Sequence, residues 1–517
     1  MSNFAVVFTL FITVSVKNQE NRSSEAERHL FDRILKYTGV FGSVQGVSMV
    51  VTLVINMVKS RLLGPMGYGI TESLNRTTDI VKNSTNLGIT TVAVPEISCH
   101  ANDADAGKLT DKIRLTRSWA LLTAILGMAV CVILAPVLSR YAFNGDRSYT
   151  VSFMVLSLAV AATAITGGET AVLRGSGMLR QLALSQLFTY VLSLCVSVPL
   201  YWLFNLKGIV PALALTAVGG SIVTCFYSFK RFPYKVSPFS WSFLRTGFGM
   251  MGFGVFFTVT SFLGAWVWSY IAKYLTGTGG PELTGTYSAG YMLVTYLTNL
   301  LLAVTDSEYY PRLSGAGNDM PQAHHLMSNQ ALAMCMLAGP IVILFMLCMP
   351  LVVFVVLDYD TFQPSIILAQ MAVVGLFFKS VSQPIAYLVL ARSDSRVYLI
   401  QETVCYGFLV TCVIAGYKYL GITGLGLSFA AWELTYLLLA LLVSRLRYGY
   451  VMSSDLVKNF LAQGVMVAVA ALCVFKGGRI WIAAGAVICI VSIVFSVRFF
   501  SRRTTFIQTL ISKVSRR

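Results

Sequence analysis

A line of polar and charged residues interrupts an apolar part of the chain, in the stretch GYGITESLNRTTDIVKNSTN at residues 67–86. The line consists of Glu72, Arg76, Asp79, Asn83 and Asn86, with Lys82 beside it. Because these residues are three or four positions apart, a helix of about 100° per residue places them within ~40° of one line. A charged side chain facing lipid costs about 2.5 kcal/mol or more, so we expect this polar stripe to face protein or water.

Two interpretations of the stripe remain open. Glu72 can pair with Arg76 at i,i+4, and Asp79 with Lys82 at i,i+3, which would only neutralise a buried face. Alternatively, the stripe lines a water-filled cleft and meets a charged substrate. The second interpretation is favoured because the chain contains an internal repeat whose second copy lacks the charges.

A few other ionisable or polar residues lie inside apolar runs. Lys379 is followed by Gln383 and Tyr387 at i+4 and i+8, which places the three on one helical face. Glu169 and Glu433 lie in two further runs. Each acid is either a proton site or a local hydrogen-bond partner, and the sequence leaves both possibilities open.

The composition indicates that the apolar segments lie in a lipid bilayer. The 517 residues are 56% hydrophobic and 12% charged, whereas soluble domains carry about a quarter charged residues. Continuous apolar runs of ~20 residues, enough to span ~30 Å, recur along the chain. They predict an all-α, polytopic membrane protein and disfavour a β-barrel, whose strands would alternate. The ten cysteines contain no C-x-x-C, so we expect no metal or other cofactor.

Counting the runs gives about 14 transmembrane helices with both termini in the cytoplasm. This arrangement puts 27 Lys and Arg on the cytoplasmic side and 9 on the other, as the positive-inside rule requires. The net charge of +17 is thereby explained without nucleic acid as a partner. Residues 1–36 would form a cytoplasmic or interfacial segment, and residues 4–16 are too short to span. Residues 448–517 would add two helices and a basic tail.

The chain repeats itself. VPEIS at residues 94–98 matches YPRLS at 310–314, and LRGSG from Leu173 matches ARSDS from Ala391, with offsets of 216 and 218 residues. Two six-helix lobes, residues 37–232 and 233–447, would then lie parallel around a central cavity. Adding 218 to the stripe positions reaches only uncharged residues, which are Gly290, Val294, Leu297, Leu301 and Val304.

The stretch KSRLLGPMGYGITESLNRTTDIVKNSTNLGITTVAVPEIS, residues 59–98, resembles polysaccharide flippases of the Wzx type in its LGPMGYG turn, its LGI and its proline-containing end. The resemblance covers roughly residues 35–447, and the superfamily also contains multidrug and toxin extrusion (MATE) exporters and the lipid II flippase. It implies two six-helix lobes that move an undecaprenyl-diphosphate-linked oligosaccharide between leaflets by alternating access, with membrane lipids around them and the polymerase and glycosyltransferases of the same process as partners.

The resemblance also implies roles for residues. Arg76, Lys82 and Lys379 would offer cations to the diphosphate or to an acidic sugar. Glu72 and Asp79 would orient them or bind a coupling H⁺ or Na⁺, and Glu169 and Glu433 are further candidates for ion coupling. The residues expected to contact the sugars and the polar head are Asn83, Gln383, Tyr387, Tyr291 and Asn299.

Rival functions remain. Residues 39–58 contain no Asp or Glu, unlike drug exporters, whereas two extra C-terminal helices also occur in the lipid II flippase. A membrane glycosyltransferase or polymerase could use Asp358 and Asp360 as a metal-binding D-x-D motif. We interpret this motif as a loop at a helix end, because the outer loops are short. The chain is therefore expected to be a transporter of the inner membrane of a bacterium and not an enzyme.

Overall fold

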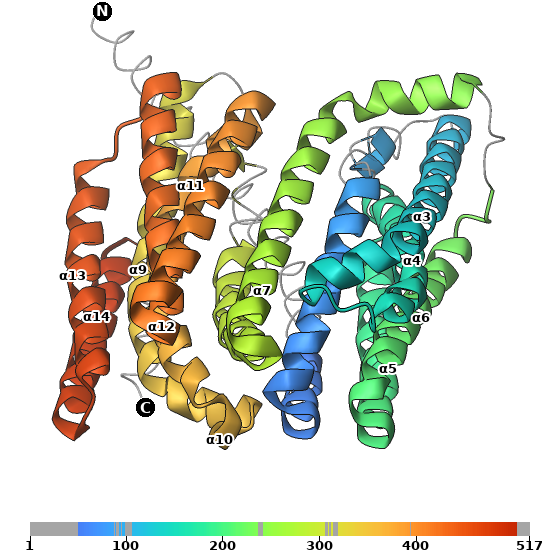
Figure 1. Ribbon diagram of the computed structural model, residues 1–517. Helices are drawn as coiled ribbons and strands as arrows, with labels where there is room; N and C mark the ends of the chain where they lie inside the picture. Colours follow the sequence, from blue (N-terminus) through green and yellow to red (C-terminus); the bar gives the residue numbers. More distant parts are fainter. Residues whose placement is uncertain are drawn as a thin grey trace, which may run out of the picture. The chain divides into compact units, whose positions relative to one another are not determined.

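Figure 1 shows the computed structural model. It describes residues 50–503, apart from residues 87, 89–92, 95, 99–105, 236–240, 305–308, 310–311, 314–318 and 393. The chain divides into one unit of residues 1–50 and a second of residues 51–517. Nearly all of the described residues belong to the second unit, and the predicted interfacial segment at residues 4–16 lies outside the described ones.

The described residues form helices and no strands, which confirms the predicted all-α class. A long helix covers residues 50–85. It is followed by α3 (Ala106–Ala142), α4 (Thr150–Gly175), α5 (Leu179–Phe204), the short 3₁₀ helix η1 (Asn205–Gly208), α6 (Ile209–Phe229), α7 (Trp241–Val304), α9 (Met320–Val356), α10 (Tyr359–Phe362), α11 (Pro364–Ala391), α12 (Ser395–Tyr448), α13 (Ser454–Lys476) and α14 (Arg479–Arg503).

Three of the long helices reverse direction at a glycine. Gly64, Gly280 and Gly421 have φ values of 61°, 74° and 59°, which glycine adopts without the steric cost that a side chain would bring. In α12, Ser428 Oγ donates a hydrogen bond of 2.6 Å to the Cys412 carbonyl. Each of these helices is therefore a hairpin of two packed segments.

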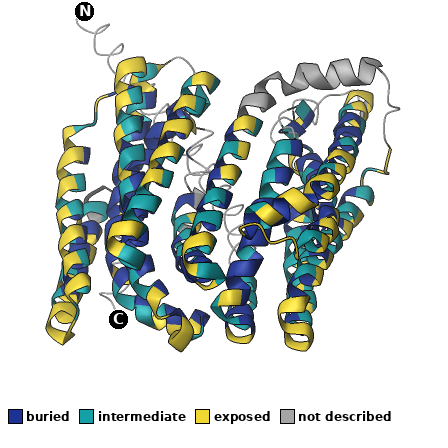
Figure 2. Cartoon of the chain, viewed as in Figure 1, coloured by how far each residue is buried: buried dark blue, intermediate teal, exposed yellow. Residues whose placement is uncertain are grey.

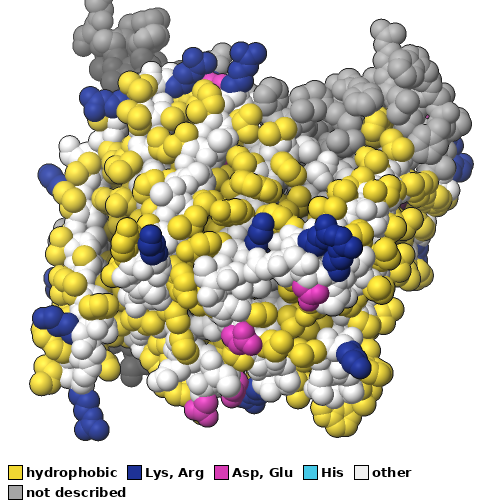
Figure 3. All heavy atoms as spheres, in the orientation of Figure 1, with side chains coloured by type: hydrophobic (Ala, Val, Ile, Leu, Met, Phe, Trp, Pro, Cys, Tyr) yellow, Lys and Arg dark blue, Asp and Glu magenta, His cyan; other side chains and the backbone are white. Residues whose placement is uncertain are grey.

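Eight helices in the described part of the chain are long and apolar enough to cross a membrane. One of these spans, Arg180–Phe229, joins α5 and α6, and another, Ser395–Tyr448, contains the reversal at Gly421. The visible face in Figure 3 is covered mostly by hydrophobic side chains, with few charged groups among them. The chain is thus a multi-pass membrane protein, whereas the count of fourteen spans stays a prediction.

Two large hydrophobic cores lie within the second unit. The first-bundle core is formed by α3, α4, the start of α6 and Tyr201 of α5, together with the apolar face of residues 63–81. The second-bundle core is formed mainly by α7, α9, α11 and α12, with contributions from Tyr68, α10, α13 and α14. Helix α11 is covered by its neighbours along most of its length, whereas α13 and α14 expose much of their surface (Figure 2). The exact boundaries 37–232 and 233–447 stay predictions.

The two C-terminal helices are present and are held to α9 by a buried polar chain. Gln463 Nε2 donates to Ser496 Oγ at 2.9 Å, and Ser492 Oγ donates to Gln463 Oε1 at 2.7 Å. Ser496 Oγ in turn donates to the Met336 carbonyl at 2.7 Å. These bonds satisfy the polar atoms of α13 and α14 where they meet α9, as burial requires.

The turns of the first two hairpins touch each other backbone to backbone. A Cβ atom on Gly69 would overlap the Pro281 carbonyl, and one on Gly285 would overlap the Pro65 carbonyl. The two segments share the pattern G-P-x-x-x-G, starting at Gly64 and at Gly280, 216 residues apart. The contact is therefore reciprocal, as expected for two related copies of one unit.

Candidate functional site

A cleft of about 310 Å³ lies beside the polar stripe. It is lined by Arg76, Asp79, Asn83, Ser261, Gly264, Ala265, Trp268 and Tyr406. The stripe therefore contributes three of the predicted residues, and the rest come from the first segment of α7 and from α12. The polar face of the stripe helix turns toward this cleft, while Ile70, Leu74 and Val81 on its other side are buried in the first-bundle core.

The structure shows the internal pairs of the first interpretation and the cleft of the second, while the charged substrate stays a prediction. Arg76 Nε lies 2.7 Å from Glu72 Oε1, and Lys82 Nζ lies 3.0 Å from Asp79 Oδ1. The Arg76 guanidinium also lies 5.3 Å from the centre of the Trp268 ring, within the range of a cation–π contact. Both cations are thus paired internally, and Arg76 also lines the cleft, whereas Lys82 does not. An anion that approaches Arg76 would have to compete with the Glu72 carboxylate.

A third ion pair joins α11 to the second segment of α12. Lys379 Nζ lies 2.8 Å from Glu433 Oε1, and Glu433 is almost fully buried. Lys379 also lies 5.6 Å from the centre of the Trp432 ring. The sequence places Lys379 and Glu433 in separate runs, and the structure brings them together.

A cluster of aromatic rings connects the Arg76–Glu72 pair to the Lys379–Glu433 pair. The Trp268 ring stacks on Tyr291 at 4.8 Å between centroids and meets Trp432 edge-on at 6.2 Å. Tyr291 and Trp432 both contact Phe429, at 4.5 and 5.1 Å. Aromatic faces of this kind suit sugar rings and cations. Of these rings the sequence singles out only Tyr291, because Trp and Phe within an apolar run carry no signal that separates them from core residues.

The other predicted substrate residues lie apart from the lining of the cleft. Gln383 Nε2 donates to Tyr387 Oη at 2.7 Å, and the Tyr387 ring stacks on Tyr309. Tyr309 Oη donates to the Pro384 carbonyl at 2.8 Å, so this group helps to join α11 to the segment after α7. Asn299 is exposed and does not line the cleft.

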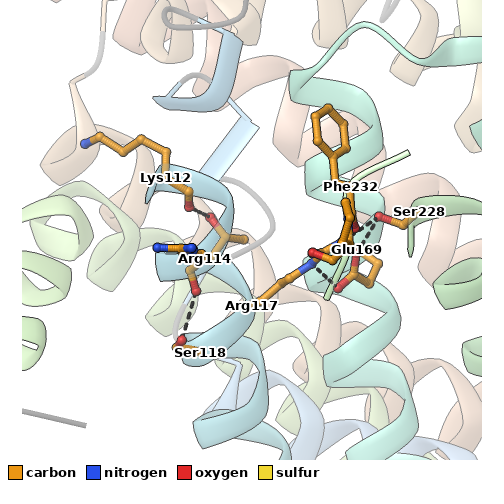
Figure 4. A network of polar contacts seen from close by, with 9 residues as sticks. Lys112, Arg114, Arg117, Ser118, Glu169, Ser228 and Phe232 are labelled. Carbon is orange, nitrogen blue, oxygen red and sulfur yellow. Dashed lines mark hydrogen bonds and ion pairs between the residues drawn. The ribbon is translucent and has the colours of Figure 1, made fainter. Parts of the chain in front are cut away.

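Glu169 belongs to a different network, shown in Figure 4. Arg117 on α3 binds both its carboxylate oxygens, at 2.8 and 3.0 Å, and Ser228 Oγ donates to it at 2.5 Å. Arg117 also donates to the Phe232 carbonyl at 3.1 Å. The carboxylate is therefore held between α3, α4 and the end of α6. Burial raises the pKa of the Tyr234 phenol beside this network, and Glu169 adds to that shift.

The D-x-D motif forms the start of the short helix α10. Thr361 Oγ1 donates a 2.7 Å hydrogen bond to Asp358 Oδ2. Among the described residues, no group of three or more His, Cys, Asp and Glu is placed to hold a metal ion. Asp358 thus makes the local contact expected of a residue at a helix end.

Residues 34–316 match the model of a family described as polysaccharide biosynthesis protein, over more than half of the chain. The chain belongs to this family. No curated protein sequence matches it at a significant level. Membership fits the predicted resemblance, whose motifs all lie in the matched part.

This member of the polysaccharide biosynthesis family is similar in structure to several solved transporters. It is similar to an inward-facing multidrug resistance MATE transporter of the MOP superfamily, with a TM-score of 0.62 and 14% identity over 78% of this chain and 94% of that one. A MOP superfamily transporter from Pyrococcus furiosus gives 0.58 and 14% over 80% and 96%. A variant of a Vibrio cholerae MATE transporter gives 0.58 and 14% over 82% and 99%. The chain therefore has the MATE-type fold.

Proposed function

We propose that this protein is a flippase that moves undecaprenyl-diphosphate-linked oligosaccharide units across the bacterial cytoplasmic membrane by alternating access. Surface polysaccharides such as O-antigen, capsule or exopolysaccharide would be built from the transported oligosaccharide units. The observation that carries the proposal is Arg76, held over Trp268 at the edge of a cleft, in a chain of the polysaccharide biosynthesis family. A cation beside an aromatic face matches a ligand with a diphosphate next to a sugar.

The residues around the cleft suggest how such a head is held. Arg76 exchanges its bond to Glu72 for charge-assisted hydrogen bonds to a phosphate oxygen. Asn83 and Tyr406 offer hydrogen bonds to hydroxyl groups of the sugars. Lys82 adds positive charge beside Asp79, and the lipid tail stays in the bilayer. Lys379 would reach the anion only after the aromatic cluster rearranges, since it does not line the cleft.

The experiment combines genetics with chemistry. The gene is deleted in its host, and surface polymer and lipid-linked repeat units are quantified. The strain is then complemented with wild type, with Arg76→Ala, or with Arg147→Ala, a matched control on an exposed loop. We expect lost polymer and accumulated lipid-linked units, rescued by wild type and the control and at least tenfold less by Arg76→Ala. Full rescue by Arg76→Ala would contradict the role of the cleft.

A lipid II-type flippase is a second candidate, favoured by the two C-terminal helices docked on α9. In that case depletion would stop cell-wall growth and accumulate peptidoglycan precursor, while surface polymer would be a secondary loss. The identity of the accumulated lipid separates the two candidates.

A further inference from the structure

The charges around Lys379 do not balance. Lys379 pairs with Glu433, but a second carboxyl, Glu402 on the first segment of α12, lies within electrostatic reach of both. Glu402 is 8% exposed, and Tyr436 Oη donates to its Oε1 at 2.9 Å. Lys379 is thus the counter-charge of two buried carboxyls, Glu433 and Glu402.

Among the residues that the structure describes, the other titratable groups that face Glu402 supply no further positive charge. They are the phenols of Tyr398, Tyr406 and Tyr436 and the thiol of Cys405. Tyr291 of α7 faces Lys379 and Glu433 and is also uncharged. With both carboxyls ionised, the cluster would carry one net negative charge inside a membrane-spanning bundle. An uncompensated buried charge costs several kcal/mol, so the cluster must gain one positive charge.

We propose that Glu402 binds a proton and is a protonation site of the second bundle. Tyr436 occupies Oε1, which leaves Oε2 to carry the proton. Glu402 lies one helical turn before Tyr406, whose side chain lines the cleft, so the proton comes from water there and returns to it. The inference rests on the charges around Lys379 and not on the identity of the transported lipid.

The site has a mechanical consequence. While Glu402 is protonated, Glu433 is the only carboxylate for Lys379 within the cluster. When the proton leaves for water, Glu402 becomes a second carboxylate that attracts the same ammonium group. The position of Lys379 between α11 and the two segments of α12 therefore depends on the proton.

The test is an infrared titration of the purified full-length protein in lipid, which needs no substrate. The C=O stretching band of a protonated carboxylic acid is followed at neutral pH. We expect this band in wild type, its loss in Glu402→Gln, and its displacement in frequency in Glu402→Asp. Glu433→Asp should leave its frequency unchanged, and Asp360→Asn, on the exposed part of α10, should change nothing. Coupled carboxyls share their titration, so loss of the band in Glu402→Gln does not by itself show which carboxyl holds the proton. The frequency shift in Glu402→Asp, without one in Glu433→Asp, assigns the proton to Glu402.

Two results would overturn the proposal. One is a band that persists in a folded Glu402→Gln protein or that shifts with Glu433→Asp. The other is a band that disappears when K⁺ is replaced by Na⁺ at constant pH, which would make a metal cation the ligand. If Glu402→Gln does not fold, the comparison of the two Asp variants still decides. A failed complementation by Arg76→Ala leaves all of these outcomes unaffected.

Discussion

At the scale of single residues, the ion pair between Lys379 and Glu433 holds two segments of the second bundle together. Glu433→Gln should cost little stability, because Glu402 can release its proton and become the counter-charge of Lys379. Lys379→Met leaves the buried Glu433 carboxylate unpaired and should lower the free energy of unfolding by roughly 2 kcal/mol. This is less than the 3–5 kcal/mol of a fully buried pair, because Lys379 keeps 30% of its side chain exposed. Thermal unfolding in detergent measures the effect.

The double variant separates pairing from packing. With both charges removed, no unpaired group remains, so the double variant should lose clearly less than the sum of the two single variants. A loss equal to the sum would mean that the two side chains act independently, in spite of the 2.8 Å between their charged atoms.

Gly264 sets the space available to Tyr406. A Cβ atom at this position would lie 2.8 Å from Tyr406 Oη and 3.2 Å from Cζ, so Gly264→Ala should displace the phenol from its place in the cleft. We expect several-fold lower complementation by Gly264→Ala at unchanged protein level, measured as surface polymer. Adding Tyr406→Phe removes the nearer atom and should restore part of the activity. An equally inactive double variant would contradict this explanation.

The sequence predicts the stripe better than the rest of the site. Arg76, Asp79 and Asn83 follow a periodicity that any amphipathic helix shows, and they line the cleft together. Trp268 and Phe429 come into contact only because α7 packs on α12. A contact between residues so far apart in the chain cannot be predicted from local sequence patterns. No sequence pattern singles out Arg117, whose side chain is buried against Glu169.

At the scale of elements, the two G-P-x-x-x-G turns form a contact without side chains. Because a methyl group on Gly69 would overlap the Pro281 carbonyl, Gly69→Ala should separate the two turns. Tyr68 is buried, with its ring against Phe362 and its hydroxyl donating to Met292 Sδ. Separation of the turns should expose this position to solvent. Maleimide labelling of Tyr68→Cys, in a background without reactive native thiols, should become at least severalfold faster.

The second glycine supplies the reciprocal test. Gly285→Ala should have the same effect as Gly69→Ala, and the double variant should add little, since one contact is lost only once. Gly407→Ala is the matched control, because a methyl group there meets nothing within 4 Å. Unchanged labelling in both Ala variants would show that the contact does not hold the turns together.

The class of the elements was predictable, and their ends less so. Continuous apolar runs fixed the all-α class, and glycines mark the hairpin turns at Gly280 and Gly421. The sequence could not show that the extra helices α13 and α14 are tied to α9, because Gln463, Ser492 and Ser496 are ordinary small or polar residues until the helices pack.

At the scale of the whole molecule, the contact between the turns sets the register of the repeat in this part of the chain. The offset is 216, not the 218 used to compare the stripe with its counterpart. The counterparts of the stripe are then Ser288, Met292, Thr295, Asn299 and Leu302. None is charged, so the asymmetry between the copies survives the correction. Beside the buried Arg117–Glu169 pair, the first copy carries charges on the stripe, whereas the second carries buried charges on α11 and α12, at Lys379, Glu433 and Glu402.

The orientation of the repeat in the membrane gives the last prediction. Fourteen spans with cytoplasmic termini put the loop of residues 143–149 outside and the loop of residues 449–453 inside. In a cysteine-free background, Ser148→Cys should therefore react with a membrane-impermeant maleimide in intact cells, whereas Ser453→Cys should react only after permeabilisation. Both serines lie outside the helix interiors, Ser148 between α3 and α4 and Ser453 at the N-cap of α13. The substitutions remove one local hydrogen bond each, from Ser148 Oγ to Asp146 and from Leu456 N to Ser453 Oγ, so both variants are first checked for an unchanged protein level. Labelling of both from outside would require an even number of crossings between them and would remove the positive-inside argument for this chain. Labelling of Ser453→Cys alone in intact cells would mean that the topology is inverted. Arg76 would then lie nearer the opposite leaflet from the one that the present topology predicts.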